Sequence, residues 1–359
     1  MKLFNILFIM LLPFVGVANN TPTKKHEKTK TVHKVFSVNE NATVYLKNKY
    51  GNLNVTTWNE DKVDITVKIT VKGNNADKVE DKLKSIKIQF EATKSLVEAR
   101  TIIESTKSNW SFWGNNNNTN YKINYFVKMP KTNNADFHNK YGNIDLDVLE
   151  GKANINCDYG KIEIDQLKNE SNTIDLDYCS TSEINYMKSG NINVDYSKLK
   201  VKETNAVKVN ADYSGIQVGN ATSVNFNSDY GSIRINNAED IIGNSDYAGI
   251  KIGTVTKNLK INTDYGGVRV NNIAKGFESV DIDGSYAGIK LGTSEDNNFD
   301  FVINLGYAGF SYPDDNVEMI KRIKKTTKKY YKGTFGKGNS NSKVTIKSSY
   351  GGVSLKIID

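Results

Sequence analysis

The chain has 359 residues, a formal net charge of +8 and a mean hydropathy of −0.52. Nearly all of the positive charge is lysine, because only four residues are arginine, the side chain that nucleic-acid readers use for bidentate contacts. The composition therefore argues against a nucleic-acid partner, and the length allows one long domain and a smaller unit.

The first 18 residues are predicted to be a secretory signal peptide. Lys2 precedes an apolar run from Leu3 to Val17, and Gly16-Val17-Ala18 offers small residues for cleavage. The run is too short to span a membrane, and no other stretch approaches the ~20 apolar residues that a span needs. We therefore expect an exported protein without a transmembrane segment, located in the periplasm, at the cell surface or in the medium.

Two lysine clusters hold much of the positive charge. One lies within residues 19–34, predicted to be a basic linker, and the other within 321–332. Two interpretations stay open: solvated surface segments, or weak attachment to anionic lipid or polysaccharide.

Residues 35–134 are predicted to form an N-terminal antiparallel β-rich domain that includes the first repeat. Alternating apolar residues predict a long strand over 63–71, and helical spacing predicts a short helix over 76–83. Further strands are expected at residues 86–90, 96–103 and 121–129. Because solenoid ends expose unpaired backbone groups, we expect this domain to cap one end of the repeat array.

A motif centred on a tyrosine occurs twelve times, with alternating apolar residues before it and apolar residues three and five positions after it. The tyrosines are Tyr50, Tyr141, Tyr159, Tyr178, Tyr196, Tyr213, Tyr230, Tyr247, Tyr265, Tyr286, Tyr307 and Tyr350. From Tyr141 to Tyr265 the steps are 17 to 19 residues long. Such a period indicates a repeat architecture.

The Tyr213 repeat illustrates the expected coil. Val207, Val209 and Ala211 share the parity of Tyr213, whereas Ile216 and Val218 have the opposite parity. The switch predicts two short strands joined by a corner at Ser214-Gly215, where the glycine can adopt a positive φ. One such repeat cannot bury its apolar side chains alone, so coils must stack ~4.8 Å apart, with the tyrosine rings packed coil on coil.

We therefore predict an all-β fold: a parallel β-solenoid of ~17–18-residue coils over residues 135–310, with the N-terminal antiparallel β-rich domain as its cap. Residues 311–342 break the period and are expected to form a lysine-rich helix, over 317–331, and a loop. The terminal coil, residues 343–359, is expected to close the rod.

An aspartate directly precedes the tyrosine in seven consecutive repeats. These residues are Asp158, Asp177, Asp195, Asp212, Asp229, Asp246 and Asp264. The row favours solvated carboxylates that accept hydrogen bonds at the corner. A row of hard-cation sites such as Ca²⁺ is the alternative, although calcium requires six to eight oxygen ligands.

Trp110, Phe112 and Trp113 lie in a polar, asparagine-rich stretch and are the candidate ligand-binding residues. They suggest either glycan binding through exposed aromatic rings or packing back onto the N-terminal domain. No catalytic, zinc, P-loop or dinucleotide motif stands out around the three histidines, so we expect no cofactor and no catalytic residue, although an enzyme stays open. The cysteines, Cys157 and Cys179, are expected to be free thiols.

The Lys-Tyr-Gly-Asn openings at Tyr50 and Tyr141, the Asp-Tyr series and the closing Ser-Tyr-Gly-Gly-Val at Tyr350 make the chain resemble a bacterial adhesin-like family of unknown function, found in exported proteins of Bacteroidetes-type bacteria and related to adhesin-head domains. This resemblance covers residues 35–359 and implies a scaffold, without assigned functional residues. The leading hypothesis is an exported non-enzymatic β-solenoid for adhesion or binding at the cell envelope, with a glycan or an envelope protein as partner. The alternatives are a carbohydrate-active enzyme on a solenoid scaffold and a periplasmic sensor or regulatory partner-binding protein.

Overall fold

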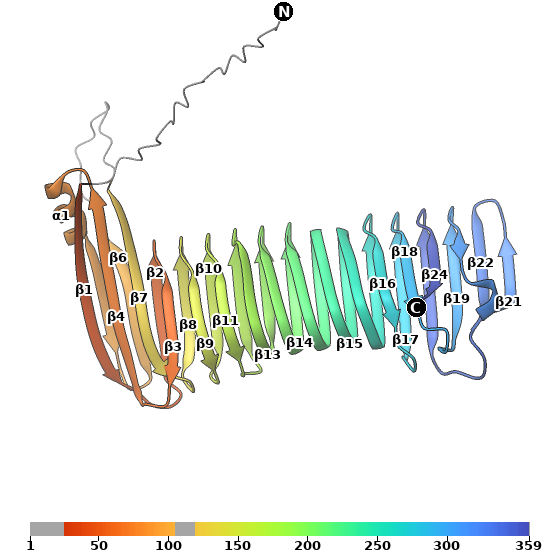
Figure 1. Cartoon of the computed structure of the whole chain (residues 1–359), viewed down its shortest axis with the longest axis horizontal. Coiled ribbons are helices and arrows are strands. Elements are labelled where there is room, and N and C mark those ends of the chain that lie inside the picture. The colour runs from red at the N-terminus through yellow and green to blue at the C-terminus, as the bar shows by residue number, and fades with distance from the viewer. Residues whose placement is uncertain (1–24, 105–118, 359) are drawn as a thin grey trace, which may run out of the picture.

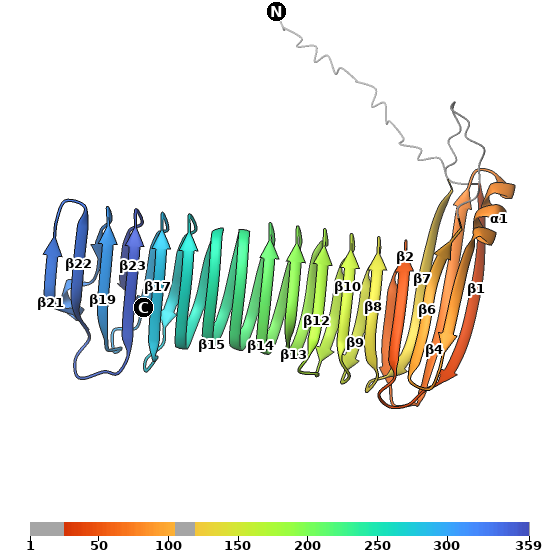
Figure 2. The same cartoon turned by 180° about the vertical axis from the view of Figure 1, so that it is seen from behind.

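The computed structural model describes residues 25–104 and 119–358, which form one long β-rod (Figures 1 and 2). Coils lie side by side along the rod, from β1 at one end to β21 at the other (Figure 1). The described residues contain one α-helix and otherwise almost only strands and turns. The all-β, solenoid-like fold predicted from the tyrosine period is confirmed.

Each coil contributes one strand to each of two layers. We call the strands before the tyrosines the first layer and those after them the second layer. The first layer contains β2 (Thr43–Lys49), β8 (Asn134–Lys140), β10 (Ala153–Asp158), β12 (Asn172–Asp177), β17 (Ser279–Ser285), β23 (Lys343–Ser349) and β19 (Phe299–Gly306). The second layer contains β3 (Leu53–Trp58), β9 (Ile144–Leu149), β11 (Ile162–Leu167), β16 (Val268–Ile273), β18 (Ile289–Thr293), β24 (Val353–Ile357) and β20 (Phe310–Ser311). Three long strands pass through both layers: β13 (Thr181–Asp195), β14 (Lys198–Asp212) and β15 (Gly215–Asp264).

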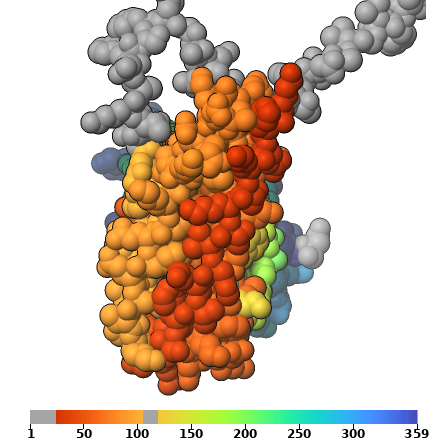
Figure 3. All heavy atoms as spheres, turned by 90° about the vertical axis from the view of Figure 1, so that its left-hand side faces the viewer, coloured from red at the N-terminus to blue at the C-terminus, as the bar shows by residue number. Residues whose placement is uncertain are grey.

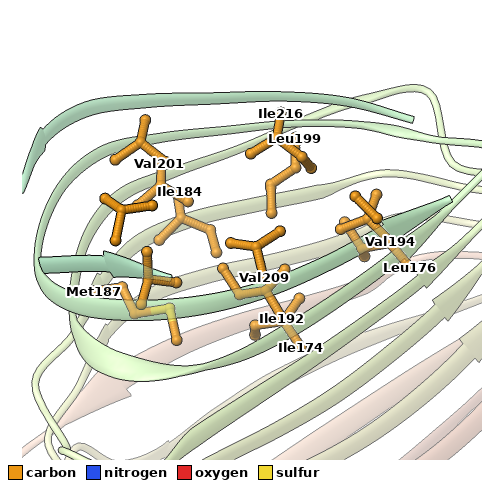
Figure 4. Close-up of a cluster of buried hydrophobic side chains, with 14 of the residues drawn as sticks. Ile174, Leu176, Ile184, Met187, Ile192, Val194, Leu199, Val201, Val209 and Ile216 are labelled. Atoms are coloured by element: carbon orange, nitrogen blue, oxygen red, sulfur yellow. The ribbon is translucent and has the colours of Figure 1, made fainter. Parts of the chain in front are cut away.

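Neighbouring coils pair in parallel with matched register. Asp195 stands opposite Asp212, and Asp212 opposite Asp229, so equivalent residues form straight columns along the rod. Side chains alternate between the interior and solvent, as the period of two requires. The core is therefore a thin apolar seam between the layers, in which first-layer Ile192 and Val209 meet second-layer Leu199 and Val201 (Figure 4).

The N-terminal end changes from parallel to antiparallel pairing. β6 (Leu96–Ile103) and β7 (Asn120–Pro130) continue the two layers in parallel beside β2 and β3. Beyond them, β5 (Ile86–Ala92), β4 (Lys62–Gly73) and β1 (His26–Ser37) pair antiparallel. These strands and α1 (Ala76–Ser85) cover the end of the rod (Figure 3).

The strands and the helix expected between residues 63 and 129 are confirmed, and Asn75 caps α1 by accepting a hydrogen bond from the Lys78 amide at 2.9 Å. The basic linker expected at 19–34 is wrong for its second half. β1 begins at His26 and pairs with β4 along its whole length, because the edge of β4 otherwise has unpaired backbone groups.

The last coil does not close the rod, contrary to the sequence-based expectation. β23 pairs with β17 on one side and β19 on the other, and β24 pairs with β18 and β20. Residues 343–357 are thus inserted between two coils that are consecutive in the sequence, and the tyrosine order along the rod becomes Tyr286, Tyr350, Tyr307.

The helix expected over 317–331 is also wrong. After a 3₁₀ turn, η1 (Asp314–Asn316), the chain forms a hairpin of β21 (Val317–Lys324) and β22 (Lys328–Phe335). β22 pairs antiparallel with β19, and Tyr331 and Phe335 are buried. The free edge of β19 supplies hydrogen-bond partners for a strand, and these outweigh the local helical tendency.

Both lysine clusters lie at the ends of the rod. Lys28, Lys30 and Lys34 are in β1, and Lys321 and Lys324 are in β21. Each of these strands pairs on one side only among the described residues. Charged side chains on open edges oppose end-to-end association, so the clusters have a structural explanation that neither sequence-based interpretation contained.

The two cysteines are free and buried in adjacent coils. The Cys179 thiol donates to the Cys157 carbonyl oxygen over 3.0 Å. The hydrogen bond between the two thiols, together with burial, raises the pKa of Cys157 above the ordinary range, which makes this thiol unreactive at neutral pH.

Candidate functional site

The tyrosines form a continuous ridge along one edge of the rod, which we call the tyrosine ridge. Ring centroids of neighbouring coils are 4.7 to 5.1 Å apart, and most ring planes lie within 5° of parallel. The predicted stacking of the rings is confirmed. Tyr213 does not share the buried face of Val209, because its side chain is 53% exposed. The same is true of the whole ridge beyond Tyr50, so it is a surface feature.

The corner of each coil is made by the tyrosine itself. All twelve tyrosines have positive φ values, between 48° and 65°, and they are the only described non-glycine residues that do. The expectation that Gly215 supplies the positive φ is wrong. A left-handed tyrosine costs roughly 1–2 kcal/mol, and the ring stack together with hydrogen bonds such as Tyr213 N–H to Asp229 C=O, 2.9 Å, offsets this cost.

Stacking determines what the ridge can offer a ligand. The ring faces of an interior member such as Tyr230 are covered by Tyr213 and Tyr247, at 4.9 and 4.8 Å. Only ring edges and hydroxyl groups face solvent, so a sugar cannot stack on an interior ring. The ridge can instead donate and accept hydrogen bonds through a row of phenol groups.

Variants at Tyr230 test this account of the ridge. We expect Tyr230→Ala to lower the free energy of unfolding by about 1–3 kcal/mol, because two ring pairs are lost. Tyr230→Gly should be about 1 kcal/mol more stable than the alanine variant, because glycine accepts the left-handed conformation. Tyr230→Phe should match the wild type in urea unfolding. An alanine variant at least as stable as the glycine variant would show that backbone strain is not stored at the corner.

The aspartate row is a straight column beside the ridge. Its carboxylates lie on the solvent side of the first layer, and only Asp158 forms an ion pair among the described residues, with Lys140 at 3.3 Å. Partial burial and the like charges of Asp195 and Asp229 raise the pKa of Asp212, and Asp177 behaves in the same way. In the described parts of the chain, no three histidine, cysteine, aspartate or glutamate side chains converge to hold a metal ion.

Asp212→Asn is expected to stabilise the rod slightly at neutral pH. A raised carboxyl pKa favours the folded state below the ordinary value of 3.8, and this contribution is lost as the pH rises through the folded-state pKa. The advantage of the variant should therefore appear as pH increases above about 4 and stay under roughly 0.5 kcal/mol, because the column is exposed and screened by salt. Thermal unfolding at several pH values in low salt measures it, and an advantage that grows towards pH 3 would contradict the sign.

A ladder of asparagines runs next to the aspartates and was missed in the sequence. Asn210 donates through its side-chain amide to Asn193 over 3.0 Å and accepts from Asn227 over 3.2 Å. Asn244 and Asn262 continue the series. The sequence signal for it was an asparagine three residues before each of several successive tyrosines. The hydrogen bonds of the ladder connect neighbouring coils on the first-layer surface.

The solvent face of the second layer is divided by charge. Its N-terminal half contains a shallow hollow of about 730 Å³ lined by five carboxylates. These are Asp145, Asp147, Glu163, Asp165 and Glu183. Lys200 and Lys202 both form ion pairs with Glu183, at the point along the rod where this solvent face changes from acidic to basic.

The aromatic candidates Trp110, Phe112 and Trp113 lie outside the residues that the structure describes. No helix among the described residues is long and apolar enough to cross a membrane. The histidines are placed singly: His33 faces Asp64 at 2.9 Å, and His138 faces Asp136 at 3.0 Å.

Comparison with solved structures finds proteins with adhesin names. A "putative cell adhesion protein" from Clostridium sporogenes is 14% identical with a TM-score of 0.19, covering 92% of this chain and 100% of that one. A "putative adhesin" from Parabacteroides merdae is 10% identical with a TM-score of 0.36, covering 91% and 96%. Another from Bacteroides fragilis is 14% identical with a TM-score of 0.26, covering 92% and 97%.

These are proteins of the kind that the tyrosine motifs resemble, but the low TM-scores give the likeness no weight in arguing function. No family model and no curated protein matches the chain.

Proposed function

We propose that the protein is an exported, non-enzymatic β-solenoid that mediates adhesion or binding at the bacterial cell envelope. The observation that carries the proposal is the tyrosine ridge, a row of half-exposed phenol groups repeated once per coil. A repeated row offers many equivalent weak contacts to a repetitive partner, and such contacts combine into strong attachment. The signal peptide proposed for residues 1–18 would bring the rod to the compartment where that partner lies.

The rod's length is the property to test. Removing residues 197–230 joins Tyr196 to Gly231, deletes two coils and preserves the repeat pattern. We expect the labelled mature chain to bind whole cells or isolated envelopes, and the shortened rod to bind more weakly while unfolding cooperatively. Cell fractionation with surface protease treatment tests the location. Failure of the full-length rod to bind any envelope fraction would reject the proposal.

A further inference from the structure

The basic half of the second layer contains a column of four exposed cations, Arg234, Lys251, Arg269 and Lys290, which we call the cation column. Lys251 stands opposite Arg269, and Arg269 opposite Lys290, in the parallel register. Arg234 precedes Lys251 by the coil length of 17 residues found in this part of the rod. Four coils at a spacing of ~4.8 Å place these charges along ~14 Å.

The members of the cation column have no acidic partner among the described residues. None of them forms an ion pair there, whereas Lys200 and Lys202 nearby share Glu183. The outward positions on either side of the column hold only serine, glycine and asparagine. They are Ser232, Gly249, Gly267 and Gly288 towards the ridge, and Asn236, Gly253 and Asn271 on the far side, where the fourth position, Gly292, is buried. Like charges at this spacing repel, so the column favours a bound anion.

The glycines between the cation column and the tyrosine ridge have room for a side chain. A Cβ atom added at Gly249 or Gly288 would meet nothing within 4 Å, and at Gly267 it would lie 3.7 Å from the nearest atom. None of the three has a positive φ. Gly249 lies in β15, and Gly267 and Gly288 come directly before β16 and β18. Neither close packing nor a positive φ explains three bare positions in successive coils.

Glycines one residue earlier in the coil provide the contrast. A Cβ at Gly231 would come within 2.0 Å of the Ser214 carbonyl oxygen, and one at Gly266 within 2.1 Å of that of Ala248. Packing against the neighbouring coil explains those glycines. It does not explain the outer column.

Together these columns make a groove beside the tyrosine ridge. A hollow of about 520 Å³ lies between the ridge residues Tyr196 and Tyr213 and the outward positions Lys198, Gly215 and Ser232. The same columns continue beyond this hollow towards the C-terminal end, with Gly249, Gly267 and Gly288 in the place of Gly215 and Ser232. There the bare positions lie between the tyrosine hydroxyl groups and the cation column.

We propose that this groove binds an extended linear polysaccharide that carries carboxylates, such as a polyuronate, with its long axis along the rod. Carboxylates would meet Arg269 and its neighbours, and sugar hydroxyls would meet the tyrosine hydroxyls on the other wall. The bare floor admits the sugar rings, each of which is roughly as long as one coil. This inference rests on the proposed function and names the ligand class for it.

A polysaccharide fits the groove better than a nucleic acid or a second copy of the rod. The ridge presents ring edges and no free interior ring faces, so it cannot stack bases as single-strand binders do. A second copy could place its acidic half against the cation column, but such docking would not need bare glycines beside the ridge. Both occupants are outcomes of the test.

The charge test uses the mature chain, polygalacturonate as the probe, and neutral amylose and single-stranded DNA as comparisons. Lys251→Gln with Arg269→Gln is expected to weaken polygalacturonate binding roughly tenfold or more at low salt. The matched control, Lys208→Gln with Lys260→Gln, removes the same charge from exposed positions of the first layer and should change affinity less than roughly twofold. Equal losses in both variants would reduce the effect to net charge and overturn the proposal.

The floor test separates binding from stability. Gly249→Thr with Gly267→Thr should abolish polygalacturonate binding, while the melting temperature stays unchanged or rises, because both sites have room for a Cβ atom, neither has a positive φ, and threonine restricts the unfolded chain more than glycine does. A lower melting temperature would show that the fold needs these glycines, and unchanged binding would show that the floor is not used. Either result overturns the proposal.

Other outcomes are equally decisive. DNA binding as tight as polygalacturonate binding would identify a non-selective basic surface, and rod dimers that dissociate in the Lys251→Gln, Arg269→Gln variant would identify a second copy as the occupant. Cell binding that survives both groove variants would retain the proposed function and reject the groove. Polygalacturonate binding without any envelope binding would retain the groove and reject the proposed function.

Discussion

Replacement of Phe226 by alanine is expected to destabilise the rod by about 3–5 kcal/mol, the largest effect of any single substitution proposed for it. Phe226 is 1% exposed and lies in the first layer at the centre of the rod. The equivalent position of the next coil is Gly243, and a Cβ there would lie 2.1 Å from the Cζ atom of the Phe226 ring. The ring therefore fills the space that a side chain at Gly243 would occupy, and its removal leaves a cavity that neither coil can close.

The same geometry predicts strong coupling between the two positions. Gly243→Val alone should lower the free energy of unfolding by about 1–3 kcal/mol or more, because the neighbouring coils hold the Phe226 ring in place and it cannot move away from the new side chain. Phe226→Val with Gly243→Val gives both coils a β-branched residue and should be more stable than either single variant. Urea unfolding of the wild type, Phe226→Val, Gly243→Val and the double variant measures the coupling energy between the two positions, which should be roughly 0.5–3 kcal/mol.

Val209→Ala supplies the matched control for the coupling. Val209 is the equivalent core residue in the coil before Phe226, two coils from Gly243. Its cost should add to that of Gly243→Val within about 0.5 kcal/mol, since the two sites share no contact. Additive costs for Phe226 and Gly243 as well would mean that the ring does not occupy the space above the glycine.

The period of the tyrosines was enough to predict the coil, because each coil's burial pattern is local. Val207, Val209 and Ala211 alternate with polar residues, so any fold that buries them must form a strand there. Ile216 and Val218 have the opposite parity and then require a second strand beyond a corner. Stacking of rings at one coil spacing follows from parallel register. The same reasoning gave strands β4 to β7 and helix α1.

The sequence could not show which coil lies beside which. Every coil offers nearly the same edge to its neighbours, so a coil separated by an insertion can pair wherever an edge is free, and β23 pairs between β17 and β19. The hairpin of β21 and β22 was missed for a related reason, since the free edge of β19 favours a strand that local propensity did not predict.

The candidate site shows the same limit at the level of single residues. The aspartate row was visible in the sequence, but the two kinds of glycine at the corner look alike there. Gly266 fits against a neighbouring coil, whereas a Cβ at Gly267 would meet no atom closer than 3.7 Å, and only their surroundings in three dimensions distinguish the two glycines. The positive φ at the tyrosines was missed because such strain in a bulky residue depends on compensation by other coils.

Removal of residues 343–359 is expected to unfold the C-terminal end of the rod beyond β18. The segment buries Val344, Ile346, Val353 and Leu355, each worth about 1.5–3 kcal/mol. β23 of this segment also pairs with β17 on one side and with β19 on the other. Its loss therefore separates residues 299–335 from the rest of the rod. A terminal coil at the tip of the rod would instead leave those residues protected when removed.

Limited proteolysis with mass spectrometry distinguishes these cases. In the truncated chain we expect rapid cleavage throughout residues 299–335 and continued protection of the coils up to Thr293, since each coil depends mainly on its neighbours. Addition of the peptide 343–359 should restore part of the protection, because it offers the missing strand to the edges of β17 and β19. Protection of residues 299–335 in the truncated chain, at the level of the full-length protein, would mean that β19 can pair directly with β17. The last coil would then be an insertion that the rod tolerates, because straight columns of equivalent residues let the coils close up in register once it is gone.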